Sequence, residues 1–182
     1  MTITIRKMDR AKDKRGVMAI DTAFETATVF DVVVTPRRIE LVERALPTPL
    51  VKRYPIGDAF AHWAQWDTAF VAVDGGICGF AAIEYEAWHA RLVLWHLYVT
   101  PARRREGVGR ALLARVEDHG RELGARRVWL ETSNVNVPGI AAYARLGYSL
   151  CGADTTYYDA TYAEDETAIY LAKAIPRTYL DR

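Results

Sequence analysis

The feature that most constrains this chain is a run of three strand patterns that leads into a glycine-rich turn and a helix. Ala69–Val73 and Ile77–Glu86 are joined by Asp-Gly-Gly at 74–76, which is a tight-turn signal. A second reversal at 88–90 precedes the third strand, Arg91–Val99. Strands connected by such short turns pair antiparallel. The sequence therefore predicts a meander at the centre of a sheet.

Further helix and strand patterns alternate around this meander. Residues 28–68, which contain four prolines, do not fit a clear pattern. The order predicts an α/β fold with a mixed, mostly antiparallel central sheet flanked by helices. The predicted elements are a strand at 2–7, helices at 11–27, 107–123 and 137–146, and strands at 127–132, 148–153 and 167–172.

Length and composition exclude several classes of protein. A chain of 182 residues that is 51% hydrophobic fits one globular domain, so we expect a single domain over 1–182. A net charge of +1 gives no support for a general nucleic-acid binder. The longest apolar run, 77–83, is far shorter than the roughly 18–20 residues of a membrane span, and no signal peptide is visible. The two cysteines and four histidines lack zinc-ligand spacing. We expect a cytoplasmic protein without metal, nucleic-acid or membrane partners.

The turn after the third strand has the parts of an anion site. Gly107 and Gly109 remove side chains, so backbone N–H groups can approach a ligand closely. The following helix contributes its unpaired N–H groups and its positive end. Arg104, Arg105 and Arg110 add full charges. These parts suit a pyrophosphate, although a Gly-x-Gly turn can also serve packing alone. The pattern is neither a Walker loop nor a Rossmann fingerprint.

Two blocks of sequence carry a recognisable pattern. They are Leu97-x-Val99-x-Pro101-x-x-Arg104-x-x-Gly107-x-Gly109 and Asn136-x-x-Gly139-Ile140-x-x-Tyr143-x-x-x-Gly147-Tyr148. They resemble the signature of the GNAT superfamily of acyl-CoA-dependent N-acetyltransferases, from which Gly139 and Tyr148 depart mildly, since Ala and Phe are usual there; the resemblance covers about residues 69–173. Three further segments are Pro49-x-x-Lys52-x-Tyr54, Leu130-Glu131-Thr132 and Glu166–Tyr170. With these markers, the chain is most similar to the streptothricin acetyltransferase-like branch of the superfamily.

The resemblance implies acetyl-CoA as donor and a primary amine as acceptor. Residues 69–173 would bind acetyl-CoA, and residues 1–68 would lie on the acceptor side. Tyr143 would protonate the leaving thiolate, and the alternative is a core tyrosine. The residues implied to bind acetyl-CoA are Leu97, Tyr98, Val99, Arg104, Arg105, Gly107, Val108, Gly109, Arg110, Asn136 and Tyr143.

The general base is harder to assign. An alkylamine is only about 0.1% neutral at pH 7, so a base that removes its proton is useful. Relatives often carry Glu on the strand that here holds Trp95 and His96. Our first candidate is Glu84, which shares a strand face with Glu86, and the second is His96. The alternatives are a solvated strand face, a buried histidine, or no dedicated base.

The charge of the chain is segregated. Residues 1–15 and 100–127 each carry a net charge of +4, whereas 154–167 carries −5. The second block suits a polyanionic cofactor. The acidic block contains tyrosines and could bind a cationic amine through charge and cation–π contacts. We expect Asp159 and Tyr158 to bind the acceptor, the alternative being an exposed acidic loop.

Three functions follow from these observations. The first is an N-acetyltransferase for a small cationic molecule such as an antibiotic, acting by direct attack in a ternary complex. The second is a protein lysine or N-terminal acetyltransferase. The third is a non-catalytic acyl-CoA sensor. By resemblance to the family, we also expect a homodimer.

Overall fold

The computed structural model describes residues 3–158, 163 and 166–176, and it divides into two compact units. The first consists of Met1–Ala23, Arg53–Val128 and Ala174–Arg182, and the second of Phe24–Lys52 and Trp129–Lys173.

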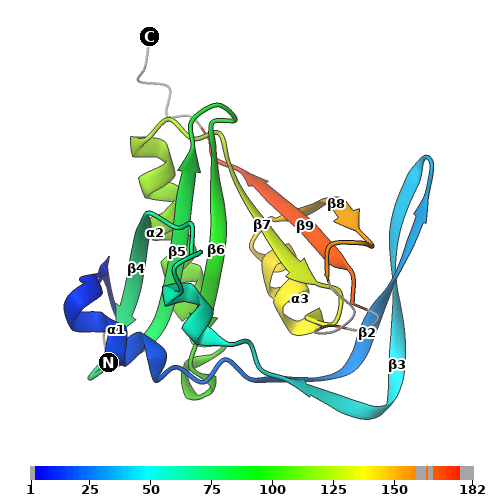
Figure 1. Cartoon of the computed structure of the whole chain (residues 1–182), viewed down its shortest axis with the longest axis horizontal. Helices are drawn as coiled ribbons and strands as arrows, with labels where there is room; N and C mark the ends of the chain where they lie inside the picture. The colour runs from blue at the N-terminus through cyan, green and yellow to red at the C-terminus, as the bar shows by residue number, and fades with distance from the viewer. Residues whose placement is uncertain (1–2, 159–162, 164–165, 177–182) are drawn as a thin grey trace. The chain divides into compact units, whose positions relative to one another are not determined.

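The strands of the first unit form the predicted meander. β4 (Thr68–Val73), β5 (Ile77–Glu86) and β6 (Arg91–Val99) follow one another as antiparallel neighbours. The short strand β1 (Thr4–Lys7) pairs antiparallel with β4 and gives the order β1-β4-β5-β6. Figure 1 shows β4, β5 and β6 side by side in green. The prediction from turn spacing is confirmed here.

The helix α2 (Val108–Glu122) packs on one face of this meander. Its apolar side buries Val108 and Leu112, as the sequence pattern predicts. A Cβ atom on Gly79 of β5 would lie 2.9 Å from Leu112 Cδ1, so glycine permits this close approach. Because alternate strand residues face opposite sides, Phe80 faces the other side, where it joins a core cluster with Val17 and other buried residues.

The first helix is shorter than predicted. α1 covers Arg10–Met18, and the chain has left the helix before β2 begins at Phe24. The prediction of a helix over 11–27 is therefore wrong beyond residue 18. Residues 24–26 instead pair with 50–52 of a partner strand that local periodicity does not reveal. The β-branched threonines of this segment also favour a strand.

A long hairpin occupies much of residues 28–68, the region for which the sequence showed no clear pattern. β2 (Phe24–Thr35) pairs antiparallel with β3 (Arg38–Lys52). The register jumps from Thr26 opposite Leu50 to Thr28 opposite Ala45. Pro47 and Pro49 lie in the stretch that this jump leaves without paired partners. Proline has no N–H to donate to a ladder, and this placement reconciles the prolines with a strand.

Besides the hairpin, the described part of the second unit includes three strands and the helix α3. β9 (Ala168–Ala174) lies between β7 (Arg127–Ser133) and β8 (Ser149–Asp154) in the order β7-β9-β8. The helix α3 spans Val137–Arg145, so it ends one residue before the predicted range of 137–146 does. Its end is followed by Gly147 with a positive φ of 88°, which is favourable for glycine.

Asn134 ties the hairpin to this unit. Its Nδ2 donates to the carbonyl of Phe30 at 2.7 Å, and its Oδ1 accepts from the N–H of Thr167 at 2.8 Å. Its backbone bonds the same two residues, with N–O distances of 3.2 and 3.0 Å. The side chain is buried, and these bonds satisfy it. One asparagine therefore holds together three segments that are far apart in sequence.

Two properties of the described residues complete the fold. None of their helices has the length and apolar character that crossing a bilayer requires. They also contain no cluster of three or more His, Cys, Asp or Glu side chains suited to a metal ion.

Candidate functional site

The end of β6 carries Leu97, Tyr98 and Val99, all partly buried. They pair with β5 in regular register, but Trp95 is an extra residue between His96 and Leu94. Such a bulge disrupts the ladder locally and increases the twist of the strand. The predicted backbone contacts of Leu97 and Val99 with a pantetheine arm therefore lie just after an irregularity in the strand.

The turn after β6 exposes the start of α2. Gly107 has a φ of 87°, and no side chain caps the helix at this residue. A Cβ atom on Gly107 would meet no atom within 4 Å. The first N–H groups of α2 are therefore available to a ligand, and the space beside Gly107 is open. This geometry fits a bound phosphate group.

The arginines of the turn differ in their surroundings. The Arg104 guanidinium donates to the carbonyls of Val99 at 3.0 Å, Ala23 at 2.7 Å and Asp21 at 3.3 Å. Burial lowers the pKa of Arg104. Arg104 therefore holds the turn in place, and any contact with pyrophosphate must compete with these bonds. Arg105 and Arg110 are exposed, and within the described residues neither forms a hydrogen bond or ion pair.

Asn136 caps α3. Its Oδ1 accepts from the N–H of Gly139 at 3.1 Å, and its Nδ2 donates to Thr132 Oγ1 at 2.9 Å. A Cβ atom at position 139 would lie 2.4 Å from Asn136 Nδ2. This contact gives a physical reason for Gly139 where the family usually has Ala. The implied contact of Asn136 with acetyl-CoA stays a prediction.

Tyr143 lies on α3 and is partly buried. Its ring packs edge-on against Tyr148 with centroids 5.4 Å apart, and its carbonyl accepts from the Tyr148 N–H at 3.0 Å. The family block thus folds back on itself, with Tyr148 supporting Tyr143. The role of Tyr143 as an acid stays a prediction.

The candidate bases have different environments. Glu84 Oε2 accepts from Trp95 Nε1 at 3.0 Å. Glu86 instead contacts Arg91 at 2.5 Å and His89 at 3.1 Å, and its hydrogen bond with Arg91 contributes most to lowering its pKa. Burial lowers the pKa of His96 to about 4, so this ring is neutral at pH 7 and a weak base. The low pKa of His96 removes the advantage that an ordinary imidazole would have as a base at pH 7.

The branch markers meet in the second unit. Lys52 Nζ forms an ion pair with Glu166, which also accepts from Ser133 Oγ. Tyr158 donates its hydroxyl to Glu131. Burial is the main cause of the raised pKa of Glu131. The sequence identified Lys52, Glu131 and Glu166 only as parts of marker segments. The partners in the two contacts are 114 residues apart for Lys52 and Glu166 and 27 residues apart for Glu131 and Tyr158, so no local pattern reveals their proximity.

Asp159, expected to bind the acceptor, lies outside the described residues. Two tryptophans of the first unit differ in their surroundings. Trp66 is buried and donates to the Ala59 carbonyl at 2.6 Å, whereas Trp63 is 61% exposed.

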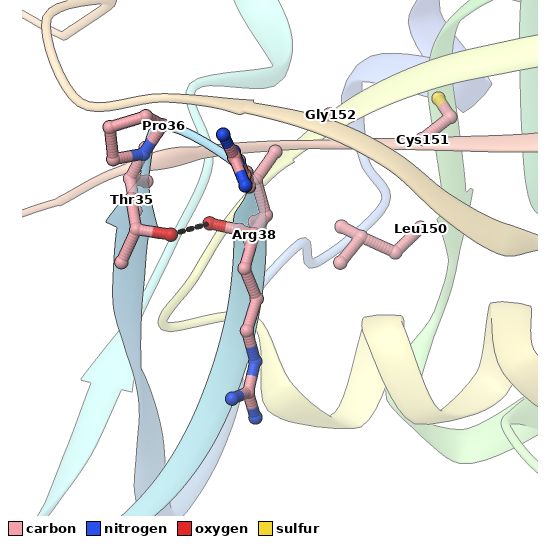
Figure 2. Close-up of a pocket in the computed structure, with 9 residues that line it drawn as sticks. Thr35, Pro36, Arg38, Leu150, Cys151 and Gly152 are labelled. Carbon is pink, nitrogen blue, oxygen red and sulfur yellow. Dashed lines mark hydrogen bonds between the residues drawn. The ribbon is translucent and has the colours of Figure 1, made fainter.

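The second unit has a hollow of about 540 Å³ that the predicted site residues do not line. It is lined by the tip of the β2–β3 hairpin, residues 34–39, and by residues 150–152 of β8. Figure 2 shows Arg38 and Leu150 at this hollow, with the Thr35 hydroxyl donating to the Arg38 carbonyl at 3.4 Å. None of the predicted site residues lines it, and we assign it no part in the reaction.

Residues 39–148 match the acetyltransferase (GNAT) family. The chain belongs to this family. It is therefore an acetyl-CoA-dependent N-acetyltransferase, which confirms the resemblance found in its two sequence blocks. The match spans the meander, the turn at the start of α2 and the whole of α3.

Two relatives match nearly the whole chain. A streptothricin acetyltransferase from Streptomyces lavendulae is 40% identical over 175 residues, which cover 92% of this chain and 93% of that protein. The crystal structure of a nourseothricin acetyltransferase superposes with a TM-score of 0.86 at 36% identity, covering 97% of this chain and 100% of that one. This superposition confirms the predicted fold class.

Two further comparisons are more distant. A Bacillus anthracis protein, solved with acetyl coenzyme A, shares the fold with a TM-score of 0.80 at 24% identity, covering 95% of this chain and 99% of that one. The bS18-alanine N-acetyltransferase of Escherichia coli strain K12 is 33% identical over 76 residues, or 42% of this chain and 51% of that protein.

Proposed function

We propose that this enzyme transfers the acetyl group of acetyl-CoA to a primary amine of a streptothricin-type antibiotic. The observation that carries this proposal is the 40% identity to streptothricin acetyltransferase across 92% of the chain. That similarity includes much of the chain outside residues 39–148, where the family match ends. The relative therefore resembles this chain beyond the part that the family as a whole shares.

The donor side of the reaction uses the turn before α2. We assign the pyrophosphate of acetyl-CoA to the uncapped N–H groups of α2 and to the exposed Arg105 and Arg110. Leu97 and Val99 supply backbone groups to the pantetheine arm, as the resemblance implies. Arg104 keeps the turn in shape through its three carbonyl contacts.

The chemical step forms one C–N bond and breaks one C–S bond. The neutral amine attacks the thioester carbonyl, loses its second proton to a base or to water, and expels the thiolate of CoA. Tyr143 returns a proton to this thiolate, which leaves as the free thiol. We keep Glu84 as the first candidate for the base, because its carboxylate lies on β5 opposite β6 and accepts a single hydrogen bond, from Trp95 Nε1.

A protein amine is the second candidate acceptor. The ribosomal-protein enzyme of Escherichia coli matches only 42% of this chain, which favours the antibiotic. The third candidate, a non-catalytic sensor, would bind acetyl-CoA without turnover. The single domain over 1–182, the cytoplasmic location and the homodimer also stay predictions, and light scattering of the purified protein tests the last.

The deciding experiment measures thiol release from acetyl-CoA with streptothricin, an aminoglycoside, a polyamine and a lysine peptide. We expect the highest kcat/KM with streptothricin. A higher value for the peptide would favour the protein acceptor. Binding of acetyl-CoA in calorimetry without turnover of any amine would favour the sensor.

A further inference from the structure

The turn before α2 contains two features that would weaken an anion site. Arg105 has a φ of 65°, in the left-handed region that a non-glycine residue adopts only at a cost. Glu106 is the only acidic residue between positions 101 and 110, and it directly precedes Gly107. Its carboxylate would repel the phosphate groups that we assign to this turn. The protein therefore has to hold a strained backbone and offset a negative charge at the same place.

Arg103 contacts groups on both sides of the turn. Its Nε donates to Glu106 Oε2 at 2.7 Å, and its Nη1 donates to the carboxylate of Asp74 in the β4–β5 turn. The Arg103 and Asp74 side chains are only 22% and 13% exposed. Water and salt screen such a pair less than they screen a fully exposed ion pair. We call Asp74, Arg103 and Glu106 together the Arg103 bridge.

The Arg103 bridge closes the turn around its strained residue. Arg103 and Glu106 lie on either side of Arg105 in the chain, so their ion pair closes the loop that contains it. The N–H of Arg103 also donates to the Thr100 carbonyl at 2.9 Å, which fixes the beginning of the turn. Asp74, which is 29 residues away in sequence, anchors the bridge to the meander. A left-handed residue persists where its surroundings hold it in this way.

We propose that Arg103 is a positioning residue for acetyl-CoA, which acts through the backbone of the turn and through Glu106. Its two ion pairs fix the turn that presents the first N–H groups of α2, and its charge offsets the Glu106 carboxylate beside the pyrophosphate. This role differs from that of Arg104, which binds backbone carbonyls, and from the direct contacts assigned to Arg105 and Arg110. The inference rests on the proposed function for the place of the pyrophosphate, and it is independent of the acceptor.

The test compares two acetyl donors in Arg103→Gln and in the wild type. Acetyl-CoA carries the pyrophosphate, whereas S-acetylpantetheine has the same thioester and pantetheine arm without it. With the best amine at saturation, we expect kcat/KM for acetyl-CoA to fall about tenfold and kcat/KM for S-acetylpantetheine to stay within about twofold. Arg103→Lys keeps the charge and should recover part of the loss. Arg121→Gln, the matched control, breaks an ion pair with Asp118 elsewhere on α2 and should change neither value.

A double variant isolates the electrostatic part of the role. Arg103→Gln leaves the Glu106 carboxylate without its arginine, and Arg103→Gln/Glu106→Gln removes that carboxylate as well. In calorimetry with CoA, the double variant should bind about threefold more tightly than Arg103→Gln alone. The difference should shrink as sodium chloride rises from about 50 to about 500 mM, because salt screens the repulsion. Equal affinities at low salt would overturn the proposed role of Glu106.

The two donors distinguish positioning from general support of the fold. Equal falls in kcat/KM for both donors would make the Arg103 bridge a structural element only and would overturn the proposal, as would unchanged values for both. A thermal melt shows whether each variant folds. If Arg103→Gln does not fold, Asp74→Asn breaks the same bridge from its other end and carries the same comparison.

Failure of the proposed function gives a different result. If the wild type acetylates no amine, that function fails, and calorimetry with CoA decides the bridge: weaker binding to Arg103→Gln than to wild type supports it, and equal binding overturns it. Arg110→Gln tests the place of the pyrophosphate separately. Unchanged CoA binding in Arg110→Gln, with weaker binding in Arg103→Gln, would reject Arg110 as a contact and support the bridge.

Discussion

The turn before α2 and the charged face of β7 are built in opposite ways. The residues of the turn come from one continuous stretch, and the turn exposes backbone N–H groups at an uncapped helix end. The face of β7 brings together Lys52, Glu131, Tyr158 and Glu166 from separate segments through an ion pair and a side-chain hydrogen bond. The difference shows which substitutions each arrangement tolerates: a turn built on backbone groups tolerates many side chains, whereas a charged face depends on each of its members.

The largest expected effect concerns Tyr143, which belongs to a continuous sequence block like that of the turn. Tyr143→Phe should lower kcat about 100-fold or more, because the thiolate of CoA loses its acid. Stopped-flow or steady-state assays measure this, and calorimetry should show unchanged affinity for acetyl-CoA. Weaker acetyl-CoA binding at unchanged kcat would make Tyr143 a binding residue.

The second prediction asks whether the region around the turn holds a usable histidine base. The pKa of His96 is about 4 in the folded protein, below its value of about 6.5 when unfolded. Between these values the unfolded chain binds more protons, so stability should fall as the pH drops from about 6.5 to 4, by up to about 3 kcal/mol. Urea unfolding across this range measures the loss, which His96→Gln should reduce. A pH–rate profile that His96→Gln shifts near pH 6–7 would contradict the low pKa.

The third prediction tests how far the β7 face depends on long-range contacts. Asn134→Ala removes two side-chain hydrogen bonds that hold the hairpin, and it should lower the free energy of unfolding by about 2 kcal/mol. Urea denaturation measures it, with Asn136→Ala as a comparison that removes a local helix cap costing about 1 kcal/mol. Equal losses in the two variants would show that the bonds to Phe30 and Thr167 add little.

The smallest effect tests the backbone character of the turn. Gly107→Ala places a Cβ in a left-handed residue with φ 87° and should cost about 1 kcal/mol of stability. Gly75→Ala is the matched control, because Gly75 has a φ of 66° and equally open surroundings at the β4–β5 turn. We expect both to lose similar stability and only Gly107→Ala to raise the KM for acetyl-CoA. A rise in both would show that strain, and not proximity to the ligand, is responsible.

The local patterns predicted the elements whose signals lie within them. The turn at 74–76 and the alternation in β5 and β6 identified the meander, and the Gly-x-Gly start identified α2. The same patterns predicted that the first helix continues to residue 27, nine residues past the end of α1, because Phe24 fits a helical spacing. The structure shows that Phe24 instead pairs with Lys52 in a strand. The hairpin was not predicted, because proline is unfavourable at a paired position inside a sheet, and only the structure shows that Pro47 and Pro49 lie in an unpaired stretch.

By itself, the sequence determined the family, the glycine-rich turn before α2 and the helix blocks, because those depend on residues close together along the chain. Only the tertiary structure decided that Arg104 binds carbonyls, that Asn136 caps a helix beside Gly139, and that burial weakens His96 as a base. It also brought Lys52 to Glu166 and Tyr158 to Glu131. The physical reason is that burial and charge balance depend on which distant segments meet, and no local pattern encodes that meeting.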